Sequence, residues 1–143
     1  MKRSILLMMC LALVPAVMEA DAYQDLDTAV ASISRGLERG ESEPVLAGVS
    51  DQVMLQFAGL MQDSGFFSHD QASFFLDELF ANAKPERFEV VSARKVSSQS
   101  QYHITAAWTI RPSNKPETRE VFVTLQNRDD QWTVASIRSS TDR

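Results

Sequence analysis

Cysteine is nearly absent from this sequence, which has a single residue, Cys10, among 143. One cysteine cannot form an intramolecular disulfide, and it cannot build a zinc–thiolate site, which needs several thiolates. Histidine is scarce too: His69 and His103 lie far apart, with no ligand-like spacing around either. The sequence therefore predicts no metal site and no cofactor.

Positive charge is in short supply, because 14 Lys and Arg face 19 Asp and Glu, a formal net charge of −5. An acidic chain without a basic patch is a poor partner for nucleic acid or for anionic lipid. Glycine-rich phosphate-binding loops and a nucleophile elbow are also absent. A Ser-His-Asp triad stays open as an alternative, because serines are plentiful.

The one long apolar run lies at the N-terminus, over residues 5–18, directly after Lys2 and Arg3. It is followed by Ala20 and Ala22, which fit a small-x-small cleavage site. A basic start, a short apolar core and a small-residue end are typical of a secretory signal peptide. The run is too short and wrongly flanked for a transmembrane helix.

We therefore predict a cleaved signal peptide at 1–22 and a single domain at 23–143, in a periplasmic or secreted protein with no membrane contact after cleavage. Cys10 then leaves with the signal, so the mature protein has no thiol for catalysis. Two alternatives remain open, an uncleaved anchor and a lipoprotein signal. The large Met9 argues against lipidation, because lipoprotein signals require a small residue before the cysteine.

Two helices are predicted from apolar spacing. Five residues of the segment 25–39 recur on one helical face: Leu26, Ala29, Val30, Ile33 and Leu37. In "SHDQASFFLDELFANA" (68–83), Ser68 and Gln71 form a capping-box pattern, and Phe67 is expected to staple onto the first turn. We interpret His69 as a solvated first-turn residue. Phe74 departs from the apolar stripe and lies near the polar side of this helix.

The remaining segments alternate between apolar and polar residues, as strands do. "ESEPVLAG" predicts one short helical turn, and "QVMLQF" a short strand. Four strands follow, at 88–96, 101–110, 119–127 and 131–139, and Ile137 breaks the alternation of the last, which predicts a bulge near 135–136. The order predicts an α+β fold, a strongly curved antiparallel sheet with helices packed on its concave face.

This order resembles the nuclear-transport-factor-two-like (cystatin-like) fold, and most closely a family of small secreted bacterial proteins of uncharacterised function. The matching segments are "LERGESEPV", "QVMLQF", "SHDQASFFLDELFANAKPERFEVV", "SQYHITAAWTI", "REVFVTLQN" and "DDQWTVASIR". They cover nearly all of 25–138, while Phe74 and Trp108 depart from the family's pattern. The resemblance implies a cone-shaped domain, often dimeric, whose sheet and helices can enclose a pocket, and it implies no reaction.

A ligand pocket is predicted on the apolar faces of the strands. Its candidate residues are Tyr102, Trp108, Trp132, Arg94 and Arg138. Arg94 alternates in phase with Phe88 and Val90, and Arg138 with Trp132 and Val134, so each arginine is expected at the rim, where it can hold a carboxylate. The alternative for the three aromatic residues is ordinary core packing.

We predict a non-catalytic binding or protein-interaction module that takes a small apolar or carboxylate-bearing ligand or a protein partner. Phe122, on the opposite face of the sheet, suits a symmetric homodimer, unless that face is merely solvated. Phe74 offers a second interaction surface. The alternative is an enzyme of the ketosteroid-isomerase or dehydratase type, with Asp63 as pocket acid and Tyr102 as donor.

Overall fold

The computed structural model describes residues 26–96 and 100–140. The predicted signal peptide at 1–22 lies outside the described residues and stays a prediction. Within the described part of the chain, no helix is long and apolar enough to cross a membrane.

The element order confirms an α+β fold. The helices are α2 (Leu26–Arg39), α3 (Ser42–Val45) and α4 (His69–Ala83), with a one-turn 3-10 helix η1 (Pro112–Asn114). The strands are β1 (Gln52–Phe57), β2 (Gly65–Ser68), β3 (Arg87–Val96), β4 (Gln101–Ile110), β5 (Glu117–Arg128) and β6 (Gln131–Ser139). Every strand except β2 follows a predicted segment closely. β2 forms within a stretch that shows no regular alternation of apolar and polar residues.

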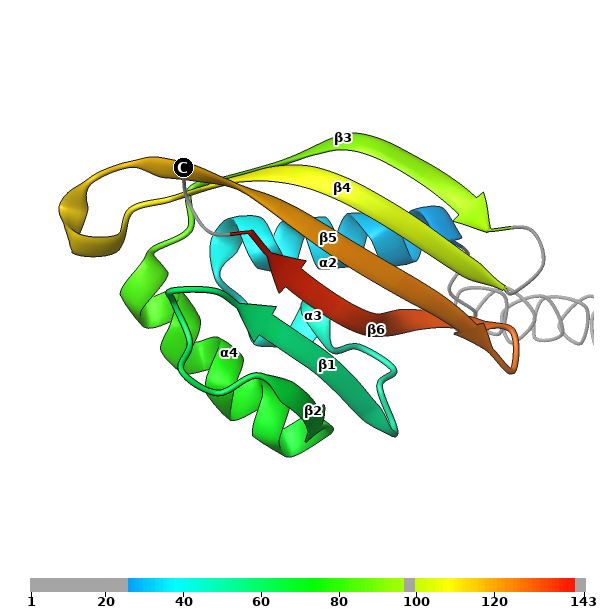
Figure 1. The fold of residues 1–143 in the computed structure, drawn as a ribbon. Helices are drawn as coiled ribbons and strands as arrows, with labels where there is room; N and C mark the ends of the chain where they lie inside the picture. Colours follow the sequence, from blue (N-terminus) through cyan, green and yellow to red (C-terminus); the bar gives the residue numbers. More distant parts are fainter. Residues whose placement is uncertain (1–25, 97–99, 141–143) are drawn as a thin grey trace, which may run out of the picture.

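The six strands form one curved sheet in the order β2-β1-β6-β5-β4-β3 (Figure 1). Every neighbouring pair is antiparallel except β1 and β6, which run parallel. The helices lie on one side of the sheet (Figure 1). We call the helix-covered side the inner face and the opposite side the outer face.

The core fills the space between the inner face and the helices. Trp108 lies at its centre, fully buried, and its Nε1–H donates a hydrogen bond to the Leu37 carbonyl oxygen at 2.8 Å. Leu37 is in the last turn of α2, where carbonyl groups lack a partner within the helix. The indole therefore connects the end of α2 to the sheet. Its ring also packs against Phe57, with ring centroids 5.7 Å apart.

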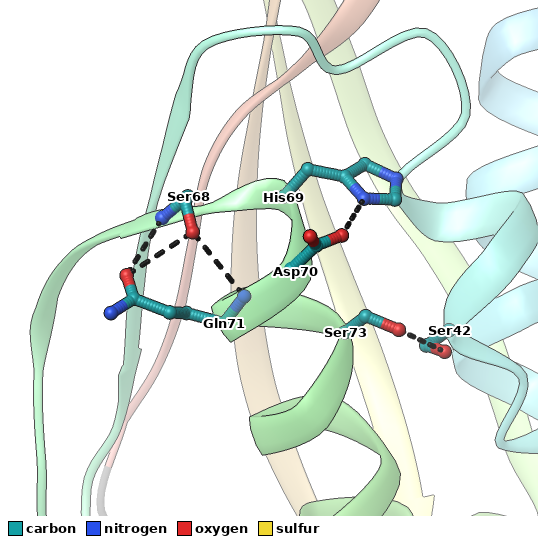
Figure 2. Close-up of polar contacts among 6 residues, drawn as sticks. All are labelled: Ser42, Ser68, His69, Asp70, Gln71 and Ser73. Carbon is teal, nitrogen blue, oxygen red and sulfur yellow. Dashed lines mark hydrogen bonds and ion pairs between the residues drawn. The ribbon is translucent and has the colours of Figure 1, made fainter.

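The stretch at the start of α4 forms the predicted capping box (Figure 2). The Ser68 Oγ accepts from the Gln71 backbone N–H at 3.3 Å, and the Gln71 Oε1 accepts from the Ser68 N–H at 3.1 Å. Phe67 packs on Phe75 with ring centroids 4.7 Å apart, so this ring contact is with the second turn of α4, and the staple onto the first turn stays a prediction. His69 is exposed, with Nδ1 3.4 Å from the Asp70 carboxylate (Figure 2).

Two β-bulges interrupt the sheet. Val90 pairs with Ala106 and Ser92 pairs with Thr105, so Val91 between them is an extra residue of β3. The other bulge is in β6, where Thr124 pairs with Ser136 and Leu125 with Val134, which leaves Ala135 as the extra residue. The second bulge confirms the sequence prediction at 135–136.

Candidate functional site

The bulges decide where Arg94 and Arg138 point. The prediction that both share the inner face with Trp132 is wrong. An extra residue reverses the alternation of every side chain beyond it, so each arginine is turned to the outer face. There Arg94 is the register partner of His103, and Arg138 is the register partner of Phe122.

The outer face is hollowed where these side chains meet. The hollow has a volume of about 350 Å³. Its lining residues come from β3, β4, β5 and β6: Ser92, Ala93, Arg94, His103, Thr105, Phe122, Thr124 and Arg138. Phe122 is 36% exposed, and none of the lining residues is acidic. We call this feature the outer hollow.

Charge pairing separates Arg94 and Arg138 from the other arginines of the strands. Arg87, Arg119 and Arg128 each contact a carboxylate, at 3.1, 2.7 and 3.0 Å. Neither Arg94 nor Arg138 makes an ion pair or a side-chain hydrogen bond with any residue in 26–96 or 100–140. Two guanidinium groups therefore border the outer hollow with donors that no described residue occupies.

Of the aromatic residues predicted for an inner pocket, Trp108 and Trp132 are buried in the core, and Tyr102 is partly buried against it. Trp108 is fully buried and its N–H is satisfied, so it is not available to a ligand and the pocket prediction is wrong for it. Tyr102 and Trp132 do share the inner face, with ring centroids 6.5 Å apart, and the Lys95 Nζ lies 6.0 Å from the Trp132 ring. These three aromatic residues line neither the outer hollow nor the hollows beside α3, beside the β1–β2 loop and at the β5–β6 turn.

Asp63 and Tyr102 are not brought together. Asp63 is exposed beyond the end of β1 and lines a hollow against α4, whereas Tyr102 stands at the start of β4. The strand register aligns the end of β1 with Val121 of β5, and it pairs Tyr102 with Leu125, four residues further along β5. Four residues of strand correspond to about 13 Å. The catalytic alternative thus lacks the facing acid and donor that it needs.

Phe74 is 59% exposed on α4, and its ring is in edge contact with the Phe75 ring. One hollow lined by a sequence neighbour of Phe74 lies between α2, α3 and α4, and it includes polar residues such as Ser73 and Asp77. There the Ser42 hydroxyl donates to the Asp77 carboxylate at 2.7 Å. The same hydroxyl lies 3.4 Å from the Ser73 hydroxyl, as Figure 2 shows. These contacts join α3 to α4, so we interpret the cluster as structural.

Sequence reasoning missed His103, Thr105 and Thr124 as members of one site with the two arginines. Alternation does place these three residues on the outer face, so that part was available from the sequence. The missing step was to carry the bulge at 135–136 forward to Arg138. Among the described residues, no group of three His, Cys, Asp or Glu side chains could hold a metal ion.

Comparison with known proteins gives a family and a fold. The model of one family, described as a domain of unknown function (DUF4783), matches residues 30–139. No curated protein matches the chain. A solved protein described as of the same family, from Bacteroides ovatus, is 21% identical with a TM-score of 0.65, and the match covers 79% of this chain and 94% of that one.

Two further solved structures share the fold. An NTF-2 like protein of unknown function from Shewanella oneidensis is 16% identical, with a TM-score of 0.58 over 79% of this chain and 93% of that one. A protein with a ketosteroid isomerase-like fold from Catenulispora acidiphila, in complex with trimethylamine, is 10% identical, with a TM-score of 0.56 over 80% of this chain and 85% of that one. These likenesses confirm the nuclear-transport-factor-two-like fold predicted from the sequence.

Proposed function

The chain belongs to the DUF4783 family, and we propose that it is a non-catalytic binding module whose binding surface is the outer face of its sheet. The observation that carries the proposal is the outer hollow, in which Arg94 and Arg138 lack partners among the described residues and Phe122 is partly exposed. Free guanidinium donors beside an aromatic ring form a combination that is enriched in protein interfaces.

Exposed apolar residues extend this surface beyond the hollow. Phe66 on β2 is 69% exposed. Phe66 is the register partner of the half-buried Met54, so these two side chains lie side by side on the outer face. Covering such residues releases about 25 cal/mol for each Å² of apolar area removed from water. A partner seated on the sheet would gain this term as well as the arginine contacts.

The chemistry of the hollow favours binding over proton transfer. An isomerase-type site needs a carboxyl group in an apolar environment and a donor opposite it. The outer hollow has no carboxyl group among its lining residues, and Asp63 and Tyr102 lie far apart. What the hollow offers is cationic donors, hydroxyl groups and one aromatic ring.

We propose a ligand or a different protein as the occupant of the hollow, rather than a second copy of the chain. A two-fold contact centred on the hollow would bring the arginines of both copies together, and like charges facing one another oppose association. The predicted homodimer would use this same outer face, and it stays a prediction. An offset contact between two copies is one outcome of the experiment below.

We also propose that the module acts after export. The support is the basic, apolar and small-residue pattern of residues 1–22. Cleavage after Ala22 would make Tyr23 the first residue of the mature protein. The intact mass of the protein from its native host tests this directly, since an uncleaved N-terminus would contradict it.

Native mass spectrometry of the protein purified from its native host tests the binding surface. The informative variants are Phe122→Ser on the outer face and Phe74→Ser on α4, which make the same change on opposite sides of the molecule. We expect wild type and Phe74→Ser to carry the same bound component and Phe122→Ser to lose it. Loss in Phe74→Ser alone would move the surface to α4. A bare monomer in every case would contradict the proposal, and a dimer dissolved by Phe122→Ser would make a second copy the occupant.

A further inference from the structure

We propose that the outer hollow binds an acidic peptide segment of a partner protein, with one carboxylate on Arg94 and another on Arg138. This inference rests on the proposed function and adds the chemical class of the ligand.

The local charge of the hollow is opposite to that of the chain. The chain has a formal net charge of −5, yet the ionisable residues lining the hollow are Arg94, His103 and Arg138. The nearest acids on the outer face are Glu89 and Glu120. Both are register partners of Ala107, which lies two residues along β4 from Thr105 of the hollow. Glu89 is already paired, because its carboxylate is 3.1 Å from the Arg87 guanidinium. A carboxylate entering the hollow therefore meets two guanidinium groups without displacing an internal acid.

Arginine is well suited to carboxylate recognition, because its planar fork of donors matches both oxygens of the acid. In this sheet the other arginines show that preference: Arg87, Arg119 and Arg128 all bind carboxylates of the same chain. Arg94 and Arg138 are the strand arginines left without such a partner in the described residues. The structure thus points to a carboxylate supplied from outside.

The spacing of the two arginines favours a peptide over a single small anion. Arg94 is on β3 and Arg138 on β6, with β4 and β5 between them. Three strand spacings and a register offset of two residues put their backbones about 16 Å apart on the sheet. In an extended peptide, residues four positions apart lie about 13 Å apart on one face, and the residue midway between them faces the same way. Two acids can therefore reach the two arginines while a central apolar residue meets Phe122.

The hydroxyl groups of the hollow suit the same ligand. Thr105 on β4 and Thr124 on β5 line it between the two arginines, and Ser92 lines it from β3, the strand of Arg94. Hydroxyl groups both donate and accept, so they can satisfy the carbonyl oxygens and N–H groups of an extended backbone. The hollow therefore offers donors for the two ends of the segment, a ring for its centre and polar partners for its backbone.

The test is a titration of the uniformly ¹⁵N-labelled protein with two capped peptides, followed by NMR. The probe is Glu-Thr-Leu-Thr-Glu, and its matched control is Gln-Thr-Leu-Thr-Gln. We expect the glutamate peptide to bind about tenfold more tightly, since each exposed charge pair adds a fraction of a kilocalorie and two are made. The shifted resonances should include those of Arg94, His103 and Phe122, and the preference should weaken in high salt.

Two double variants separate the hollow from general electrostatics. Arg94→Gln with Arg138→Gln should abolish the preference for glutamate, whereas Arg87→Gln with Arg128→Gln should keep it, although both remove the same charge. Thermal melting checks that both double variants fold. Equal binding of the two peptides to wild type, equal loss in both double variants, shifts confined to α4, or no binding at millimolar peptide would each overturn the inference.

The titration also distinguishes a peptide ligand from a free acid. Binding of the native component to the variants then distinguishes failure of this inference from failure of the proposed function. Succinate as a third probe should bind more weakly than the glutamate peptide, and equal affinity would overturn the peptide claim. If Phe122→Ser abolishes binding of the native component while Arg94→Gln with Arg138→Gln has no effect, the outer face remains the binding surface and the carboxylate claim fails. If Phe122→Ser has no effect either, the proposed function fails too.

Discussion

Arg138 on β6 is the direct register partner of Phe122 on β5, and both side chains line the outer hollow. Arg119 lies on the same strand as Phe122, but it faces inward and is only 8% exposed. It donates to the Glu117 carboxylate at 2.7 Å and to the carbonyl oxygens of Ala58 and Ser140. The two arginines therefore have opposite roles: Arg138 is exposed and has no partner among the described residues, whereas Arg119 joins the end of β1 to β5 and β6.

Substitution by glutamine should separate these roles. Arg138→Gln should change the free energy of unfolding by no more than about 0.5 kcal/mol, because an exposed residue without partners is lost. Arg119→Gln should lower it by about 3 kcal/mol, because a mostly buried ion pair and its carbonyl contacts are broken. Urea denaturation measures both values. Similar losses in the two variants would show that Arg138 has a structural partner and would weaken the account of the hollow.

Trp108→Phe should lower the free energy of unfolding by about 2 kcal/mol. The smaller ring leaves the Leu37 carbonyl group without its donor and opens space in the core. Trp132→Phe is the matched change on the same face, and it should cost less, because no hydrogen bond of the Trp132 ring connects it to a helix among the described residues. Equal losses in thermal denaturation would contradict the role given to the indole N–H.

The capping box makes Ser68 the residue that begins α4. Ser68→Ala should lower the free energy of unfolding by about 1 kcal/mol, because the Gln71 N–H loses its acceptor. Ser68→Asp should keep most of the stability, since a carboxylate can accept the same bond and favours the positive end of the helix dipole. Chemical denaturation of both variants checks the pair, and an equal loss in both would rule out capping as the reason.

Ser139 has a buried polar group whose hydrogen-bonding capacity no described residue satisfies. Its hydroxyl group is buried on the inner face and has no hydrogen-bond partner within the described residues. Ser139→Ala should raise the free energy of unfolding by about 1 kcal/mol, because an unsatisfied buried polar group is removed. The neighbouring Ser140→Ala, at a more exposed site, should change stability little. A loss of stability in Ser139→Ala would show that the hydroxyl group has a partner in the folded protein.

The sequence predicted the elements whose signals are local. The apolar stripe of α4, the capping box at Ser68 and the alternation of β4 all lie within short stretches, and all appear in the structure. The parallel pairing of β1 with β6 joins distant segments, so no local pattern indicates it. The short β2 strand at 65–68 depends on pairing with β1, and its own composition resembles a loop.

The candidate site was harder to predict, because one undetected bulge assigns every later residue of a strand to the wrong face. The bulge at Ala135 was visible, since Ile137 broke the apolar pattern. The bulge at Val91 left no trace, because Val90 and Val91 read equally well on either face of a mostly exposed edge strand. One undetected extra residue was enough to place Arg94 on the wrong face. The aromatic residues were placed on the correct face, but burial within the core, which alternation cannot report, decides what Trp108 does.

Hydroxyl-radical footprinting tests the central claim, that the outer face of the sheet is the surface covered by a partner, most directly. The protein would be oxidised as isolated from its native host and again after bound components are stripped. The account predicts that Phe122 is oxidised less in the first sample than in the second, while Phe74 is oxidised equally in both. Protection of Phe74 with no protection of Phe122, or no difference at either ring, would contradict it.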